Sequence, residues 1–134
     1  MEDLYIKYNF EDFTFENYKK LLLMALRKYK FTLFTDDFVS NSILLRHDLE
    51  FSIPIALKMA KIEASLGIKS TYLIQLHSEF YNILEKENIN AINKITSLGH
   101  QIGLHFDSHF WDVNSENELD KHILFDKKIL EGYS

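Results

Sequence analysis

The chain has 134 residues, the usual size of one domain, and its 46% hydrophobic and 26% charged residues indicate a folded core rather than disorder. Its 15 Lys and Arg against 20 Asp and Glu give a net charge of −5, which disfavours nucleic-acid binding, and the lack of cysteine excludes disulfides and thiolate chemistry. No long apolar run follows the acidic start Met1-Glu2-Asp3. We therefore expect no signal peptide, no membrane anchor and a cytoplasmic location.

The first predicted element is a helix over residues Asp12–Lys30, with Thr14 as a suitable N-cap. Its apolar residues recur on one face at helical spacing: Phe15, Tyr18, Leu22, Ala25, Leu26 and Tyr29. A short apolar segment, Phe31–Phe34, follows it. The pair Asp36-Asp37 then indicates a solvent-exposed turn.

Two strands and the helix between them come next. Ser42–Asp48 carries Ile and Leu without alternation, which predicts a strand buried on both faces of a parallel sheet. Ser52 can cap a helix that has Pro54 in its first turn and ends near Gly67. Ile68–Leu76 is rich in β-branched and aromatic residues, which favours a second strand.

The last part of the chain repeats this alternation. A helix with Ile89, Ile92 and Ile95 on one face ends at Gly99, and Gln101–His105 is predicted to be the third strand of the core. Ser115-Glu116-Asn117-Glu118 is a capping box that opens a final helix, whose stripe includes Leu119, Ile123 and Leu130. The order strand, helix, strand, helix, strand, helix predicts a single α/β domain with a parallel sheet.

Polar side chains follow each predicted core strand. The three strands end in the segments His47-Asp48-Leu49-Glu50, His77-Ser78 and His105-Phe106-Asp107-Ser108-His109. Ligand sites of parallel α/β folds gather at the carboxyl ends of the strands, so we expect these imidazoles and carboxylates to share one rim.

His105 and His109 lie four residues apart. In a helical turn this spacing puts both imidazoles on one face, where they can bind one Zn²⁺, Co²⁺, Ni²⁺ or Fe²⁺. The alternative is that His105 is a buried or capping residue and His109 a surface residue.

Asp48 and Glu50 lie two residues apart, so both point to the same side if the strand continues, whereas a turn would aim one of them at a metal. The alternative is a solvated pair, or charges that complement the dipole of the helix beginning near Ser52. Arg46 is placed to pair with one of these carboxylates.

Other candidates have structural explanations. His47 and His100 are interpreted as packing residues, with His100 beside a helix end, and His122 is expected to face solvent. Phe110 and Trp111 could line a sugar site by stacking or belong to the core.

Several of these segments occur together in the same order as in a known family. They are Ile43–Glu50, Ser52, Pro54, Ala56-Leu57, Met59-Ala60, Ile62-Glu63-Ala64, Gly67-Ile68, Thr71-Tyr72, Ser78, Tyr81-Asn82 and Gly99–His105. From Ile43 to His109, about half of its length, the chain resembles the polysaccharide-deacetylase-like (NodB-type) superfamily.

The resemblance implies a distorted (β/α) barrel that uses one divalent metal, with Zn²⁺ expected, to hydrolyse acetyl groups on sugars. It implies that Asp48 is the catalytic base and that Glu50, His105 and His109 are metal ligands. The family usually has aspartate where Glu50 stands. Because glutamate is one methylene longer, the assignment of the metal to Glu50 or to Asp48 stays open.

The family's later motifs, which hold a histidine acid and an arginine that orients the base, are not matched. A full eight-unit barrel needs roughly 250 residues, so the resemblance implies a truncated barrel, with residues 1–41 as a lead-in helix and strand and residues 42–134 as the motif-bearing units. His77 is the candidate for a substitute acid; the alternative is a loop residue before a helix.

Three functions follow as hypotheses. The first is a metal-dependent deacetylase of acetylated sugars or oligosaccharides in polysaccharide metabolism, weak or inactive alone because of the unmatched motifs. The second is a non-catalytic remnant that keeps a metal site. The third is an interaction module whose open sheet edge pairs with a second copy or a partner chain. Neither nucleic acid nor membrane is an expected partner.

Overall fold

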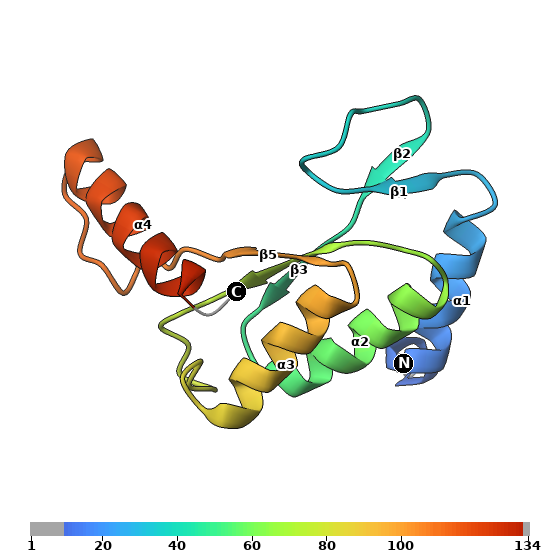
Figure 1. Cartoon of the computed structure of the whole chain (residues 1–134), viewed down its shortest axis with the longest axis horizontal. Helices are drawn as coiled ribbons and strands as arrows, with labels where there is room; N and C mark the ends of the chain where they lie inside the picture. Colours follow the sequence, from blue (N-terminus) through green and yellow to red (C-terminus); the bar gives the residue numbers. More distant parts are fainter. Residues whose placement is uncertain (1–9, 133–134) are drawn as a thin grey trace, which may run out of the picture.

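The computed structural model describes residues 10–132, so the acidic start Met1-Glu2-Asp3 lies outside the described residues (Figure 1). After a 3₁₀ turn at Phe10–Phe13, these residues form a mixed α/β fold of four α-helices and five short strands. The elements are α1 (Phe15–Ala25), β1 (Lys30–Thr32), β2 (Ser42–Leu44), β3 (Arg46–Leu49), α2 (Ile53–Ser65), β4 (Thr71–Ile74), α3 (Lys86–Ser97), β5 (Gln101–Leu104) and α4 (Glu116–Glu131).

The strands form two small sheets, and every pairing is parallel. β3, β4 and β5 lie in that order, and β1 pairs with β2. The predicted parallel α/β arrangement is confirmed, and residues 10–132 form no closed barrel. Because β1 and β2 pair across the predicted boundary near residue 41, the lead-in segment and the motif-bearing units are joined by a strand ladder.

The predicted strand over Ser42–Asp48 is wrong in one respect: it is two strands in different sheets. β2 pairs with β1 as far as Leu44, and β3 pairs with β4 from Arg46 onward. Leu45 lies between the two ladders, where its carbonyl accepts the N–H of Thr71 at 3.0 Å. Burial on both faces is also wrong, because Arg46 and Asp48 are exposed.

The predicted helix signals are confirmed. The side-chain oxygens of Thr14, Ser52 and Ser115 each accept the N–H of the residue three positions later, which caps α1, α2 and α4. Gly67 (φ +72°) and Gly99 (φ +92°) follow the ends of α2 and α3 in the left-handed conformation that favours glycine. The helix predicted over Asp12–Lys30 is shorter, because a 3₁₀ turn precedes α1 and turns replace its last residues.

The core lies between the β3-β4-β5 sheet and the helices α2 and α3, which cover one of its faces (Figure 1). Its buried members are Leu49, Ile53, Ala56, Ala60, Tyr72, Ile74, Ile83, Ala91, Ile92, Ile95 and Leu130. The opposite face carries Asp48 on β3, Leu73 on β4 and Gly103 on β5, which are in register. No helix within residues 10–132 is long and apolar enough to cross a membrane.

Candidate functional site

Asp48, Glu50 and His105 come together on the sheet face that α2 and α3 leave open. Side chains alternate along a strand, so Asp48 shares its face with Glu50, and Gly103 shares its face with His105 two residues later. The Nε2 atom of His105 lies 3.6 Å from Asp48 Oδ2 and 3.9 Å from Glu50 Oε1. Side chains from β3 and β5 therefore meet across β4.

Arg46 belongs to the same group. Its Nη2 donates to Asp48 Oδ2 at 2.9 Å, which confirms the predicted pairing with a carboxylate. The two residues lie two positions apart on β3 and point to the same side, so strand geometry makes the contact. Both side chains are partly solvated, and the ion pair orients Asp48 more than it stabilises the fold.

The ring of His105 has one nitrogen without a partner. Its Nε2 faces the two carboxylates, whereas its Nδ1 is buried and accepts or donates no hydrogen bond among the described residues. A metal-bound histidine normally donates its second ring N–H to an acceptor that fixes the ring. The described residues do not supply that acceptor.

His109 lies apart from this group. Its side chain is 98% exposed, and its nearest charged partner is Asp107, at 3.7 Å. The segment after β5 is not helical: Asp107 Oδ1 accepts the backbone N–H groups of His109 and Phe110 and turns the chain. The expectation that the four-residue spacing brings His105 and His109 to one face fails, because it required a helical turn.

Asp107, which the sequence analysis gave no role of its own, shapes the loop after β5. Its Oδ2 accepts from the side-chain amide of Gln75, at 3.0 Å, and so links the ends of β4 and β5. Burial alone would raise the pKa of Asp107, but the hydrogen bonds from His109, Phe110 and Gln75 lower it. The sequence signal was an aspartate in the loop after a strand, because Asp side chains often accept the backbone N–H two residues on and form an Asx turn.

His77 is hydrogen-bonded to Asp126 of the last helix, α4. Its Nε2 lies 3.2 Å from Asp126 Oδ1 on α4, and its ring stacks flat on Phe110 with centroids 3.6 Å apart. The indole N–H of Trp111 donates to the other oxygen of Asp126 at 3.0 Å. No hydrogen bond or ion pair among residues 10–132 joins His77 to Asp48, Glu50 or His105.

The expectation for His122 is wrong. Its ring does not point freely into solvent but stacks on Trp111, with centroids 4.0 Å apart and an interplanar angle of 18°. His122 can stack on Trp111 because α4 packs beside the loop that follows β5. The spacing of residues along the sequence does not reveal this contact.

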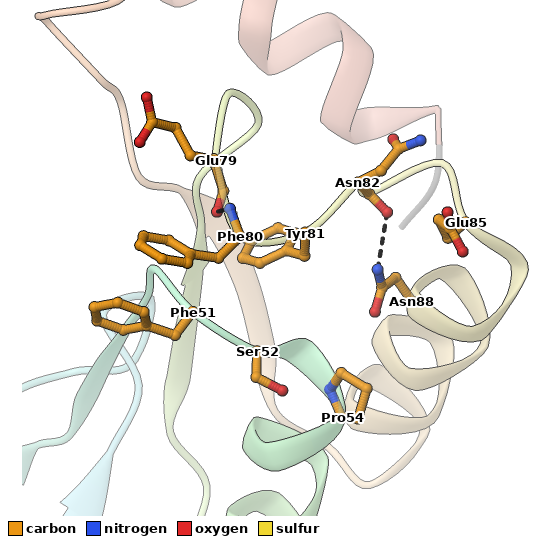
Figure 2. Close-up of a pocket in the computed structure, with 10 residues that line it drawn as sticks. Phe51, Ser52, Pro54, Glu79, Phe80, Tyr81, Asn82, Glu85 and Asn88 are labelled. Carbon is orange, nitrogen blue, oxygen red and sulfur yellow. Dashed lines mark hydrogen bonds between the residues drawn. The ribbon is translucent and has the colours of Figure 1, made fainter.

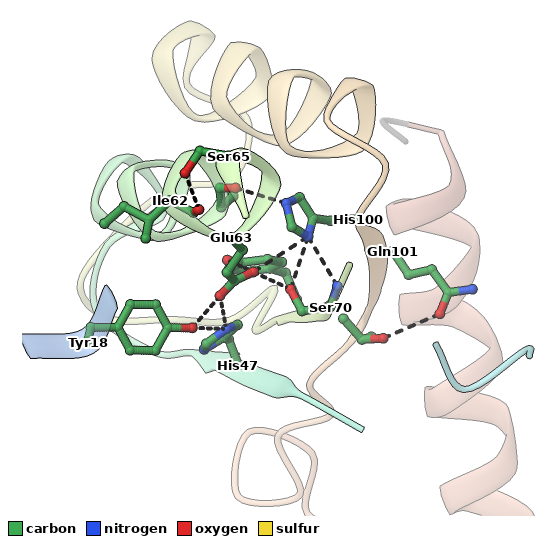
Figure 3. Close-up of polar contacts among 11 residues, drawn as sticks. Tyr18, His47, Ile62, Glu63, Ser65, Ser70, His100 and Gln101 are labelled. Carbon is green, nitrogen blue, oxygen red and sulfur yellow. Dashed lines mark hydrogen bonds and ion pairs between the residues drawn. The ribbon is translucent and has the colours of Figure 1, made fainter. Parts of the chain in front are cut away.

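A second polar cluster is buried on the helix side of the sheet, around Glu63 of α2 (Figure 3). One oxygen of this carboxylate accepts from Tyr18 and His47, and the other accepts from Ser70 and Tyr72. Glu63 is 0% exposed, and these four donors match the four lone-pair sites of a carboxylate. The cluster ties α1, α2, β3 and β4 together.

His100 extends the same cluster toward β5. Its Nδ1 accepts the backbone N–H of Ser70 at 3.2 Å, so the ring proton is on Nε2, which donates to the carbonyl of Ala60 at 3.0 Å. Burial lowers the pKa of His100, which keeps the ring neutral. His47 and His100 were expected to be ordinary packing residues, but His47 is hydrogen-bonded to the buried Glu63, and His100 is hydrogen-bonded to Ser70, which itself donates to Glu63.

The pKa values in the cluster follow from Glu63. Burial alone would raise the pKa of Glu63, but the hydrogen bonds from His47, Ser70 and Tyr18 outweigh it and lower that pKa. Burial and the neighbouring Glu63 raise the pKa of Tyr18 and Tyr72. Glu63 is therefore an ionised acceptor and the two tyrosines are neutral donors.

A sequence signal for the buried carboxylates did exist. Glu63 continues the helical spacing of the buried residues Ala56 and Ala60, and Asp126 lies on the stripe that ends in Leu130. A lone carboxylate in an apolar stripe is expensive to bury unless it is paired, so it predicts hydrogen-bond donors on the facing elements. The identity of these donors depends on how the elements pack in the tertiary structure.

The fit of a divalent metal depends on the Asp48, Glu50 and His105 side chains. With metal–ligand bonds of about 2.0–2.2 Å, ligand atoms around one tetrahedral ion lie roughly 3.5 Å apart, close to the His105–Asp48 separation. Two carboxylates and an imidazole are suitable donors. However, no group of three or more such side chains within residues 10–132 is arranged to hold a metal as it stands, and Asp48 Oδ2 is engaged by Arg46.

The donor chemistry therefore fits a divalent ion, whereas the arrangement is not preformed for one. No family model, no curated protein and no solved structure matches this chain.

Proposed function

We propose that this chain is a metal-dependent hydrolase of the NodB deacetylase type, built on part of a distorted (β/α) barrel and acting on acetylated sugars or oligosaccharides. The observation that supports it best is that Asp48 on β3 and Glu50 just after it meet His105 just after β5, on one face of a parallel sheet. The resemblance over Ile43–His109 assigns the same residues to the reaction.

Glu50 and His105 would hold the ion, with Zn²⁺ expected and Co²⁺, Ni²⁺ or Fe²⁺ as alternatives, and His109 would join after its loop turns inward. A divalent ion at this rim supplies Lewis-acid activation of water and of the acetyl carbonyl. Glu50 is the more exposed carboxylate, and it is the one that the resemblance assigns to the metal.

The remaining steps belong to side chains of this chain. Asp48 accepts a proton from the water that attacks the acetyl carbon, and Arg46 holds that carboxylate in place at 2.9 Å. The bond between the acetyl carbon and the sugar nitrogen then breaks, and the leaving amine takes up a proton. His77 stays the predicted donor of that proton, with its ring oriented by Asp126 as carboxylates orient catalytic imidazoles.

The test combines metal content with acetate release from N-acetylglucosamine oligomers. We expect the wild type to bind about one Zn²⁺ or Co²⁺ and to release acetate slowly. Asp48→Asn should keep the metal and lose acetate release, whereas Glu50→Gln should lose both. Asp120→Asn, on the exposed side of α4, is the matched control. A metal-loaded wild type that releases no acetate from any oligomer would contradict the proposal.

A different observation supports the alternative of a non-catalytic interaction module. β3 and β5 are the edge strands of their sheet among the described residues, and an edge strand presents unpaired backbone groups to another chain. In that case a second copy or a partner chain covers the edge. A monomer in size-exclusion chromatography at all concentrations would count against the module, and the predicted cytoplasmic location is compatible with either function.

A further inference from the structure

The charged residues of this chain are divided between the two ends of the molecule. Five Lys and Arg residues and no Asp or Glu occur between Asn17 and Thr35, on α1 and just after it. Five Asp and Glu residues and no Lys or Arg occur between Ile95 and Asp120, in the loop before α4 and in its first turns. Figure 1 shows α1 and α4 at opposite ends of the molecule. These helices therefore mark a basic end and an acidic end.

The outward face of α1 combines basic and apolar side chains. Leu22 is the buried residue of this helix, and the opposite side faces solvent. That side carries four exposed residues at helical intervals of three and four: Lys20, Leu23, Met24 and Arg27. Within residues 10–132, Lys20 pairs only with Glu16, one turn earlier on the same helix, and Arg27 forms no ion pair. Met24 is 61% exposed, so both the charge and the apolar surface of this face are accessible to a partner.

The outward face of α4 has the complementary composition. Asp126 is buried, and another side of the helix carries exposed residues at intervals of four: Glu116, Asp120 and Leu124. The carboxylates of Glu116 and Asp120 form no hydrogen bond or ion pair within residues 10–132. Leu124 is 56% exposed, one turn after Asp120. Glu79, exposed in the loop after β4, adds a negative charge at this end, and Figure 2 shows its carboxylate pointing away from the cavity between that loop and the start of α2.

Both helices have the same charge polarity along their length. α1 has Glu16 in its first turn and Arg27 just after its end, and α4 has Glu116 in its first turn and Lys128 in its last. Two helices of the same polarity are complementary when they pack antiparallel, because each acidic end then lies beside a basic end. The exposed aliphatic side chains in the middle of each helix would be removed from water in the same contact.

We propose that α1 of one copy of this chain packs antiparallel on α4 of a second copy, with Met24 and Leu124 at the centre of the contact. Within one chain α1 contacts α2 and α4 contacts β5, so the complement of each face is on another molecule. Two copies that lie antiparallel to each other make this contact twice and close into a two-fold dimer.

This dimer differs from the edge pairing considered above, because it uses helices and leaves the edge strands β3 and β5 free. It is also independent of the proposed hydrolase, since it involves neither the metal nor the residues of the reaction. Helices of 11 and 16 residues bury a small area, so we expect a weak and reversible association.

Sedimentation velocity at increasing protein concentration measures the monomer–dimer equilibrium. We expect the dimer fraction of the wild type to rise with concentration and to fall with added salt, because salt screens exposed charge pairs. The α1 variant, Arg27→Glu/Lys28→Glu, should lower the association constant by about tenfold or more, since like charges then face each other. The α4 variant, Glu116→Lys/Asp120→Lys, should lower it by a similar factor for the same reason.

The matched control for the α1 variant is Lys86→Glu/Lys94→Glu. Both lysines are exposed on α3, and the control changes the net charge by the same amount. It should dimerise as the wild type does. Melting followed by circular dichroism checks that every variant is folded.

Exchanging the charges of both faces tests the pairing of α1 with α4 directly. An equimolar mixture of the α1 variant and the α4 variant should regain dimerisation, because each reversed face then meets its complement on the other chain. A chain that carries all four substitutions should also dimerise by itself. A wild type that is monomeric at every concentration would overturn the proposal, and so would single-face variants that dimerise as the wild type does. Folded variants that stay monomeric when mixed would show that α1 does not pair with α4.

Discussion

His105 Nε2 and Asp48 Oδ2 lie 3.6 Å apart, although the two residues belong to strands that are not neighbours in the sheet. They meet because β3 and β5 flank β4 in parallel register, so that Asp48 and the segment after β5 lie on the same face of the sheet. The contact is the basis for the first prediction.

His105→Ala should weaken Zn²⁺ or Co²⁺ binding by about 100-fold or more, since it removes the imidazole that faces both carboxylates. His109→Ala should weaken it by less than about tenfold, because its exposed ring must first move to reach the ion. Competition with a chromogenic chelator measures both affinities. Equal losses in the two variants would show that the loop of His109 is already turned inward when metal binds.

Glu63→Ala should lower the free energy of unfolding by about 3–5 kcal/mol, because four buried donors lose their acceptor. Urea unfolding followed by circular dichroism measures this change. Glu16→Gln is the control: its carboxylate is on the surface of α1, and the expected change is within about 0.5 kcal/mol. A small effect at Glu63 would mean that water replaces the carboxylate.

Acidification should destabilise the fold in two steps. Burial lowers the pKa of His100 below its ordinary 6.5 in the folded state, so the unfolded chain binds more protons there and stability falls as the pH drops below 6.5. The pKa of Glu63 is also lowered, from an ordinary 4.5, so its contribution is present above 4.5 and is lost as the pH falls further.

Melting temperatures measured from pH ~8 to pH ~4 would show these two steps. In His100→Gln, the decline that begins near 6.5 should be reduced while the decline below 4.5 remains. A wild-type melting temperature that is constant between the two values would contradict the role of His100.

Gly103→Ala should destabilise the chain by about 1–3 kcal/mol, since an added Cβ would lie 2.6 Å from Leu73 Cδ2 on the neighbouring strand. Leu73→Ala removes the obstructing atom, so the double variant should be more stable than the sum of the two single effects predicts. Additive losses measured by urea unfolding would show that Leu73 simply rotates away.

Asp126→Ala should destabilise the docking of α4 by about 2–3 kcal/mol, because the ring of His77 and the indole of Trp111 both lose a buried acceptor. Trp111 is the single tryptophan of the chain, so its fluorescence reports this region. We expect its emission to shift to the red. Unchanged emission and stability would show that ring stacking alone holds the helix.

The amino-acid sequence determined the alternation of strands and helices from β3 to α4, the caps at Thr14, Ser52 and Ser115 and the parallel pairing, because these follow from local hydrogen bonds and apolar periodicity. It did not reveal that Ser42–Asp48 divides between two sheets. It also placed acids and imidazoles at the strand ends. The function and the metal stay predictions, since neither periodicity nor these contacts test them.

Only the tertiary structure decided which of those side chains meet. His105 reaches Asp48 because both strands pair with β4, whereas an aspartate-stabilised turn directs His109 into solvent. Glu63 and Asp126 gather their partners from segments remote in sequence, as buried charges must. Such pairings depend on how the helices pack on the sheet, and the spacing of residues along the chain carries no record of that.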